Sequence, residues 1–371
     1  MTELADIFRR HGTAYRQKYG KRMLPSHRRA MEDIENCRTE ALGGHVYRCP
    51  ACETERYSYH SCKNRHCPKC QGEAGQAWLQ RQEKLRLPTP YFLLTFTLPE
   101  GMRWVARRNQ KLIYNLLFRA SAQATQQLAR DGRFMGGQIG MIGVLHTWAR
   151  DLSYHPHVHY LAPGGGLDAA NGNWVESKKD YFLPVKALGK LFRGKFCAGL
   201  QKAGLLPQAP KKVWSQDWVV HCLPVGNGVR AMRYLAPYIL RVALTNRRIV
   251  RLEAGRVTYT YRDSGGGETR TCTMEAERFI QRFLQHVLPR GFVKVRYYGF
   301  FSAGKRRMLQ EIRRLLGMTQ HAALAKAQSR REGNEMRCPC CGGRMRMLRT
   351  LQPQSRMLQR PPPGLVLPEA A

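Results

Sequence analysis

Two short cysteine motifs constrain the N-terminal part of this chain more than any other feature of its sequence. Each is a C-x-x-C knuckle, formed first by Cys49 and Cys52 and then by Cys67 and Cys70. Two thiolates at this spacing can bind one face of a tetrahedral ion, and two knuckles together complete a four-sulfur zinc site. Because four protein ligands leave no open position, such a site is structural rather than catalytic. The two knuckles therefore predict a shared structural zinc ion.

More potential ligands surround the knuckles: Cys37, His45, Cys62 and His66. A second zinc ion bound by Cys37, Cys62 and His66 is one interpretation, and a core thiol with surface histidines is the other. A third knuckle near the C-terminus, from Cys338 to Cys341, has no evident partner pair. A half-site, a site shared across a dimer and a remnant are all open for it.

The charge of the chain indicates a polyanionic partner. There are 62 lysines and arginines against 26 acidic residues, a net charge of +36. Such a chain repels itself unless it meets a polyanion, so nucleic acid is the expected partner and an anionic membrane surface is the competitor. No apolar run approaches the ~20 residues of a membrane-spanning helix, so we expect no membrane insertion.

The beginning of the chain mixes acidic and basic residues and lacks the apolar segment of a signal peptide. We therefore expect a cytoplasmic protein. In that reducing compartment, the 12 cysteines are expected to be metal ligands or buried thiols rather than disulfides.

Strand and helix signals are mixed without a regular βαβ rhythm. Aromatic and β-branched runs predict strands at 91–99, 140–148, 157–162, 218–225, 256–263 and 293–301. Apolar residues at helical spacing predict helices at 76–87, 104–130, 189–196, 229–244, 274–288 and 304–317. This mixture predicts an α+β fold with a mostly antiparallel sheet.

Four regions follow from these patterns. A basic helical segment occupies 1–36, and the cysteine-rich zinc-binding domain occupies 37–86. A large mixed domain follows at 87–303. The last region, 304–371, has a basic helix, the third knuckle and a proline-rich tail that is expected to be disordered.

Three histidines alternate in the stretch SYHPHVHYLAPGGG. Alternate side chains of a strand share a face, so His155, His157 and His159 are expected to point the same way. Neutral imidazoles that converge are ligands for a divalent metal ion. Pro156 lacks an amide donor and suits the start or edge of a strand, which places His155 at a looser position. A solvated polar strand face is the alternative interpretation.

Two tyrosines lie one helical turn apart downstream, at Tyr234 and Tyr238. A pair at this spacing is usually a packing pair. Here, however, a density of arginine that suits phosphate groups surrounds it. These residues are Arg230, Arg233, Arg241, Arg247 and Arg248. Pro237 opposes a regular helix through both tyrosines because it has no N–H to donate and its ring clashes with the preceding turn.

The order of these motifs resembles the rolling-circle transposases of the HUH class, in particular those of the insertion-sequence ninety-one family. The resemblance runs from about residue 5 to residue 305 and rests on the blocks LGGHVYRCPAC, SCKNRHCPKC, LHTWARDLSYHPHVHYLAPGG, LFRGKF, YLAPYILRVAL and HVLPRGFVKVRYYG. It implies an HUH endonuclease-like catalytic domain behind a zinc-binding domain. It also implies a bacterial, nucleoid-associated protein that acts on single-stranded or hairpin DNA at transposon ends.

The resemblance also implies roles for the histidines. His157 and His159 take the place of the HUH motif and would bind Mg²⁺ or Mn²⁺. Either His155 or His146 would complete the metal shell, and we favour His155.

The tyrosines take the places of the family's nucleophiles. Attack by Tyr234 or Tyr238 on a phosphodiester would give a 5′-phosphotyrosine and a free 3′-hydroxyl. Because the bond energy is retained, a second strand could be joined without ATP. The proline between the tyrosines leaves open whether one nucleophile or two take part.

The basic helix near the C-terminus begins with Lys305, Arg306 and Arg307, which we expect to contact phosphates. Two other functions share part of this pattern. One is a plasmid rolling-circle initiator or relaxase, and the other is a non-catalytic zinc-dependent nucleic-acid-binding protein. The zinc module and the order of the blocks favour a transposase. The sequence does not indicate an oligomeric state.

Overall fold

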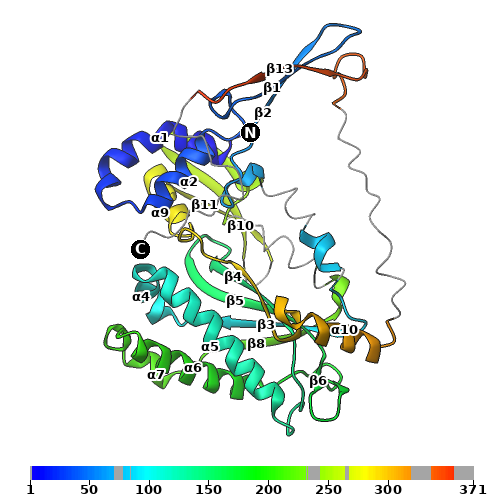
Figure 1. The fold of residues 1–371 in the computed structure, drawn as a ribbon. Coiled ribbons are helices and arrows are strands. Elements are labelled where there is room, and N and C mark those ends of the chain that lie inside the picture. The colour runs from blue at the N-terminus through cyan, green and yellow to red at the C-terminus, as the bar shows by residue number, and fades with distance from the viewer. Residues whose placement is uncertain are drawn as a thin grey trace, which may run out of the picture.

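A five-stranded antiparallel sheet lies at the centre of the protein. The computed structural model describes residues 2–70, 78–83, 85–230, 232, 243–263, 267–318 and 336–354. The strand order is β12-β4-β5-β3-β8. The strands span Pro90–Thr97 (β3), Met141–Trp148 (β4), Tyr154–Pro163 (β5), Val220–Asn227 (β8) and Val295–Tyr298 (β12). Figure 1 shows helices below this sheet and a smaller layer of helices and strands above it.

Helices cover one face of the central sheet. They are α4 (Arg103–Arg108), α5 (Gln110–Arg130), α6 (Val185–Lys202) and α7 (Lys212–Ser215). Alternate residues of β5, among them Tyr154, Val158 and Tyr160, are buried in the core on this face. The Tyr154 hydroxyl lies 2.6 Å from that of Tyr114 on α5, which ties helix to strand. His157 and His159 of β5 occupy intervening positions and therefore face the other side of the sheet.

A second core forms the upper layer. Helices α1 (Leu4–Tyr19), α2 (Pro25–Glu35) and α9 (Ala276–Leu284) pack with a sheet of order β11-β10-β9. Its strands are β9 (Ile249–Glu253), β10 (Arg256–Arg262) and β11 (Thr269–Glu275). Phe8 of α1 and Phe283 of α9 meet edge to face at 5.5 Å. The core also contains Cys37 and Cys62, so part of the cysteine-rich region folds onto this layer.

A third sheet combines the two ends of the described chain. It has the order β13-β1-β2, with β1 at Gly44–Arg48, β2 at Glu55–Tyr59 and β13 at Arg346–Leu351. Gly44 pairs with Leu351 and Arg48 pairs with Arg346, both antiparallel. Figure 1 shows the C-terminal strand, in red, beside the two N-terminal strands, in blue.

The remaining elements cover the lower part of the histidine-bearing face. They include the hairpin of β6 (Gly165–Asp168) and β7 (Asn173–Glu176), helix α10 (Arg306–Leu315) and a helical segment at 78–83. Leu93, Ile142 and Leu161 of the central sheet share one apolar cluster with Leu309 of α10.

The predicted α+β class with mostly antiparallel sheets is confirmed. The helix predicted at 104–130 is broken at Asn109, whose φ of −125° is not helical. The strand predicted at 293–301 contains only β12, because Gly299 has a φ of +58° and starts a 3₁₀ turn. The helix predicted at 229–244 lies mostly outside the described residues, as does the proline-rich tail. Within the described ranges, no helix has the length and hydropathy needed to cross a membrane.

Candidate metal centres and nucleophile segment

Three imidazoles converge on the face of the central sheet that the helices α4–α7 leave open. His146 comes from β4, and His157 and His159 come from β5. His146 pairs directly with His157 across the two strands, and His159 lies two residues further along the same face. The centroids of the His146 ring and the other two rings are 5.2 Å and 4.7 Å apart, and one nitrogen from each ring lies within 4.8 Å of the others.

Hydrogen bonds hold two of these rings at Nδ1. The Nδ1–H of His157 donates to the carbonyl oxygen of His155 at 2.7 Å. Nδ1 of His159 lies 2.9 Å from Oγ1 of Thr95 on β3. A ring whose Nδ1–H is donated keeps its lone pair on Nε2, which is the form that binds a metal ion.

Burial keeps two of the rings, His157 and His159, uncharged at neutral pH. It lowers the pKa of His159 to about 4 and holds the pKa of His157 well below its usual value, with the neighbouring His159 adding to the effect. Neutral imidazoles are the ligands that a cation requires. The donor chemistry of the three rings therefore fits a divalent ion.

The structure brings His146, and not the favoured His155, together with the other two rings. Nδ1 of His155 accepts a hydrogen bond from Arg103 on α4 at 3.0 Å. The register of β4 and β5 shifts between His146 and Trp148, which takes His155 out of line with the other rings. Trp148 stacks on His146 with ring centroids 5.2 Å apart.

Sequence reasoning missed two polar residues beside the cluster. Thr95 lies opposite His159 on one side and opposite His221 of β8 on the other. Because paired residues of neighbouring strands share a face, exposed His221 lies on the histidine side of the sheet. The alternating hydrophobic pattern of each strand indicated the face, but the order of the strands was needed to bring these residues together.

The cysteines form two four-sulfur clusters instead of the predicted pairing of two knuckles. The first cluster consists of Cys37, Cys62, Cys67 and Cys70, and the second consists of Cys49, Cys52, Cys338 and Cys341. In the first, the Sγ of Cys70 lies 3.5 Å from the Sγ atoms of Cys37 and Cys62. The predicted pairing is wrong because the Cys49 knuckle lies at the turn between β1 and β2, whereas the Cys67 knuckle packs against the end of α2 and the upper core.

His66 is not part of either cluster. Its Nε2 accepts a hydrogen bond from the backbone N–H of Leu288 at 3.2 Å, and burial holds its pKa well below the usual value. This prediction of a zinc ligand is wrong, because the ring is used to attach the cysteine-rich region to the segment after α9. His45 likewise lies outside both clusters, 3.3 Å from His60 between their Nε2 atoms.

The predicted nucleophiles, Tyr234 and Tyr238, lie outside the described residues, as do Arg233 and Arg241. The described residues on either side of this gap belong to two different cores. Met232 is buried in the cluster with Ile142 and Val144 of β4. Ala243 is buried in the upper core, against which Trp148 of β4 packs.

On β4, His146 lies between residues that belong to these two cores. Ile142, Val144, His146 and Trp148 are alternate residues of β4 and therefore share one face. His146 lies on this strand between Val144, which belongs to the same apolar cluster as Met232, and Trp148, which packs against the upper core that contains Ala243.

Sequence comparison with known proteins shows the family to which the chain belongs. Residues 7–98 match the family described as "Transposase zinc-binding domain", and residues 140–308 match the family described as "Putative transposase". The chain is 39% identical to "Putative transposase y4qJ" of Sinorhizobium fredii, over 91% of this chain and 92% of the relative. It belongs to the insertion-sequence ninety-one family of transposases.

A second relative of this transposase is the "Transposase for insertion sequence element IS801" of Pseudomonas savastanoi pv. phaseolicola. The two are 28% identical over 72% of this chain and 68% of the relative. No solved structure matches the chain. The predicted family, a DNA partner and zinc binding in the N-terminal part of the chain are thereby confirmed.

The described arginines of the transposase differ in what their guanidinium groups contact. Arg230 and Arg247 are exposed. Arg248 donates to the backbone carbonyls of Thr260 and Arg150 at 2.7 Å each, so its side chain holds the upper layer together. Lys305, just before α10, and Arg306 and Arg307 in its first turn are exposed, while Leu309 and Ile312 face the core.

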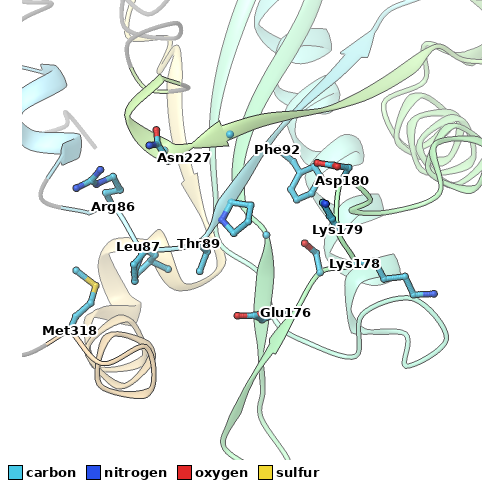
Figure 2. Close-up of a pocket in the computed structure, with 16 residues that line it drawn as sticks. Arg86, Leu87, Thr89, Phe92, Glu176, Lys178, Lys179, Asp180, Asn227 and Met318 are labelled. Atoms are coloured by element: carbon cyan, nitrogen blue, oxygen red, sulfur yellow. The ribbon is translucent and has the colours of Figure 1, made fainter.

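A pocket of about 660 Å³ lies at the far end of β3 and β8 from the histidines. Figure 2 shows Asn227 of β8 and Glu176 of β7 on opposite sides of it, with Arg86 and Met318 at one edge. The lining mixes cations with carboxylates and includes Lys178 and Lys179. Gly226, Asn227 and Gly228 at the end of β8 also line the pocket.

Proposed function

We propose that this transposase nicks and rejoins single-stranded DNA at transposon ends through a 5′-phosphotyrosine intermediate. A divalent ion at His146, His157 and His159 would polarise the scissile phosphodiester and neutralise its developing charge. The observation that carries the proposal is the convergence of these three imidazoles on one face of the central sheet.

The imidazoles fit Mg²⁺ or Mn²⁺ as part of a larger shell. Three rings supply only half of an octahedral shell, and both ions take oxygen ligands for the rest. A DNA phosphate and water are such ligands. These residues would therefore hold an ion on one side and leave positions for the substrate, unlike the four-sulfur clusters, which offer four protein ligands.

Tyr234 or Tyr238 would act as the nucleophile. A bond forms between the phenolic oxygen and phosphorus, and the bond from phosphorus to the 3′ oxygen breaks. The tyrosine loses its proton to solvent, and the leaving 3′ oxygen takes one up to become a hydroxyl. The reverse attack by a 3′-hydroxyl on the phosphotyrosine joins a strand without ATP, which gives rolling-circle transposition its rejoining step.

Basic side chains would position the DNA backbone. Exposed Arg230 and Arg247 lie close in sequence to the tyrosine-bearing segment, and Arg233 and Arg241 lie within it. The three cations that begin α10 form a further exposed set. Contacts of this kind bind without reading sequence, so the choice of the transposon end depends on other contacts with the bases.

The test is an adduct assay with labelled single strands from the ends of the transposon and Mn²⁺. We expect a band that survives denaturation, is lost on chelation of the metal and is lost in Tyr234→Phe, Tyr238→Phe or the double variant. Tyr181→Phe is the matched control, because Tyr181 is a 43% exposed tyrosine outside both the histidine cluster and the nucleophile segment. DNA binding without any adduct would contradict the proposal. Preferential cleavage of a plasmid replication origin would instead favour the initiator.

A further inference from the structure

The C-terminal knuckle lies against the first N-terminal knuckle. The Sγ atoms of Cys49 and Cys341 are 3.4 Å apart, and those of Cys52 and Cys338 are also 3.4 Å apart. All four sulfurs lie within 4.8 Å of one another. A tetrahedral four-sulfur zinc site has edges of about 3.8 Å when each Zn–S bond is ~2.3 Å. The four cysteines therefore have nearly the spacing that one tetrahedral ion requires.

We propose that Cys49, Cys52, Cys338 and Cys341 bind a zinc ion of their own and so fasten the C-terminal region to the N-terminal zinc-binding domain. Neither family match contains this set, since one ends at residue 98 and the other spans residues 140–308. Cys52 and Cys338 are 286 residues apart in the chain. The ion thus closes a loop that contains the whole histidine-bearing sheet.

Each of the two knuckles forms a backbone turn of the same kind, as expected of the two halves of a zinc site. The N–H of Cys49 donates to the carbonyl of Thr54 at 3.0 Å, and the N–H of Cys338 donates to the carbonyl five residues on at 2.8 Å. In both, the residue four positions after the first cysteine donates back to that cysteine's carbonyl, at 2.9 Å. That residue has a positive φ in each knuckle, +57° at Glu53 and +72° at Gly342.

The apolar core of this part of the protein is too small to stabilise it without further interactions. The buried apolar residues of its cluster are Cys49, Cys338 and Met345, and two of these are themselves proposed ligands. Five of the six residues of β13 are exposed, although the strand pairs with β1 over its whole length. Units with so little core usually depend on a metal ion or disulfides. A zinc ion supplies the missing free energy here.

Zinc content measured by mass spectrometry of purified full-length protein tests the proposal. We expect two zinc ions per chain in the unchanged protein and one in the Cys338→Ser, Cys341→Ser double variant. The matched control is Cys340→Ser, because Cys340 is exposed in the same knuckle but lies outside the cluster, and it should retain two ions. A Cys37→Ser, Cys67→Ser variant should lose the other ion. One ion in the unchanged protein, or two in the Cys338→Ser, Cys341→Ser variant, would overturn the assignment.

A second experiment measures whether zinc attaches the C-terminal region to the rest of the protein. A protease site inserted between Met318 and Met336 allows the chain to be cut in two after purification. With zinc bound, the C-terminal fragment should elute with the rest of the protein, in the Cys340→Ser control as well. It should separate in the Cys338→Ser, Cys341→Ser variant or after zinc removal. Separation in the zinc-loaded unchanged protein would rule the fastening out, and so would retention in the double variant.

Discussion

Thr95 on β3 and His159 on β5 face each other across the central sheet, with Oγ1 and Nδ1 2.9 Å apart. His157 is held in a similar way by the carbonyl of His155. The sheet therefore sets the orientation of both rings before a metal ion binds. Metal affinity at this site should depend on a residue that does not touch the ion.

Thr95→Val tests that dependence. The methyl group keeps the shape of the threonine but removes the hydroxyl, so the Nδ1 of His159 loses its partner. We expect the Mn²⁺ concentration that half-saturates adduct formation to rise ~10–100-fold. Thr95→Ser keeps the hydroxyl and should stay near the original value. Equal effects of the two substitutions would show that the hydrogen bond has no role in metal binding.

The choice between the two candidate third ligands gives a second prediction. His146→Ala should abolish metal-dependent adduct formation at millimolar Mn²⁺, because only two imidazoles are left. His155→Ala should preserve it, since this ring contacts Arg103 instead. Titration of each variant with Mn²⁺ makes the comparison. The reverse order of sensitivity would return His155 to the metal shell.

These histidines show where prediction from sequence stops. The strands at 140–148 and 157–162 could be predicted because aromatic and β-branched residues dominate them. Alternation then predicts that His157 and His159 share a face. Whether His146 or His155 joins them depends on the register between β4 and β5, and a slip of one residue reverses every side chain. Nothing in a single strand specifies that register.

The cysteines show the same limit over a longer range. Spacing identifies a C-x-x-C knuckle as half of a zinc site, but it does not identify the other half. The Cys49 knuckle pairs with a C-terminal knuckle that follows the whole histidine-bearing sheet, and the Cys67 knuckle pairs with Cys37 and Cys62. Those partners are chosen by the fold of the β1–β2 hairpin and by α2, so local spacing could not predict them.

Acid should destabilise the protein through His286, which lies under the β4–β5 connection. Its Nε2–H donates to the carbonyl of Leu152 at 3.1 Å, and its Nδ1 lies 3.3 Å from the hydroxyl of Thr147. Burial lowers the pKa of His286 to about 4 from 6.5. Between these values the unfolded chain binds a proton that the folded chain does not. Stability therefore falls as pH falls through this range, by up to about 1.4 kcal/mol per pH unit.

Urea unfolding of the unchanged protein and of His286→Gln at pH 7, 6 and 5 checks the direction of this pH dependence. The variant should be less stable at pH 7, because the buried ring is lost. Its free energy of unfolding should nevertheless fall less steeply toward pH 5, with a slope smaller by up to about 1.4 kcal/mol per pH unit. Parallel pH dependences would mean that His286 does not supply the linkage.

The exposed cations of α10 predict a salt effect. Replacing Lys305, Arg306 and Arg307 by Gln should weaken binding of single-stranded DNA. The slope of log affinity against log salt should become shallower by about 2, since each phosphate contact contributes ~0.7. Fluorescence anisotropy at a series of salt concentrations measures it. A control with the same loss of charge replaces exposed Lys186, Lys190 and Lys202 of α6 and should leave the slope nearly unchanged. Equal changes in both variants would indicate a diffuse charge effect.

The measurement that tests the central claim most directly is peptide mapping of the covalent adduct. The protein is incubated with end-derived single strands and Mn²⁺, the DNA is trimmed with nuclease, and the modified peptide is sequenced by mass spectrometry. We predict a nucleotide joined through its 5′-phosphate to Tyr234 or Tyr238, and its absence in His146→Ala. A nucleotide on any other residue, or the same modification without the histidine cluster, would contradict the account.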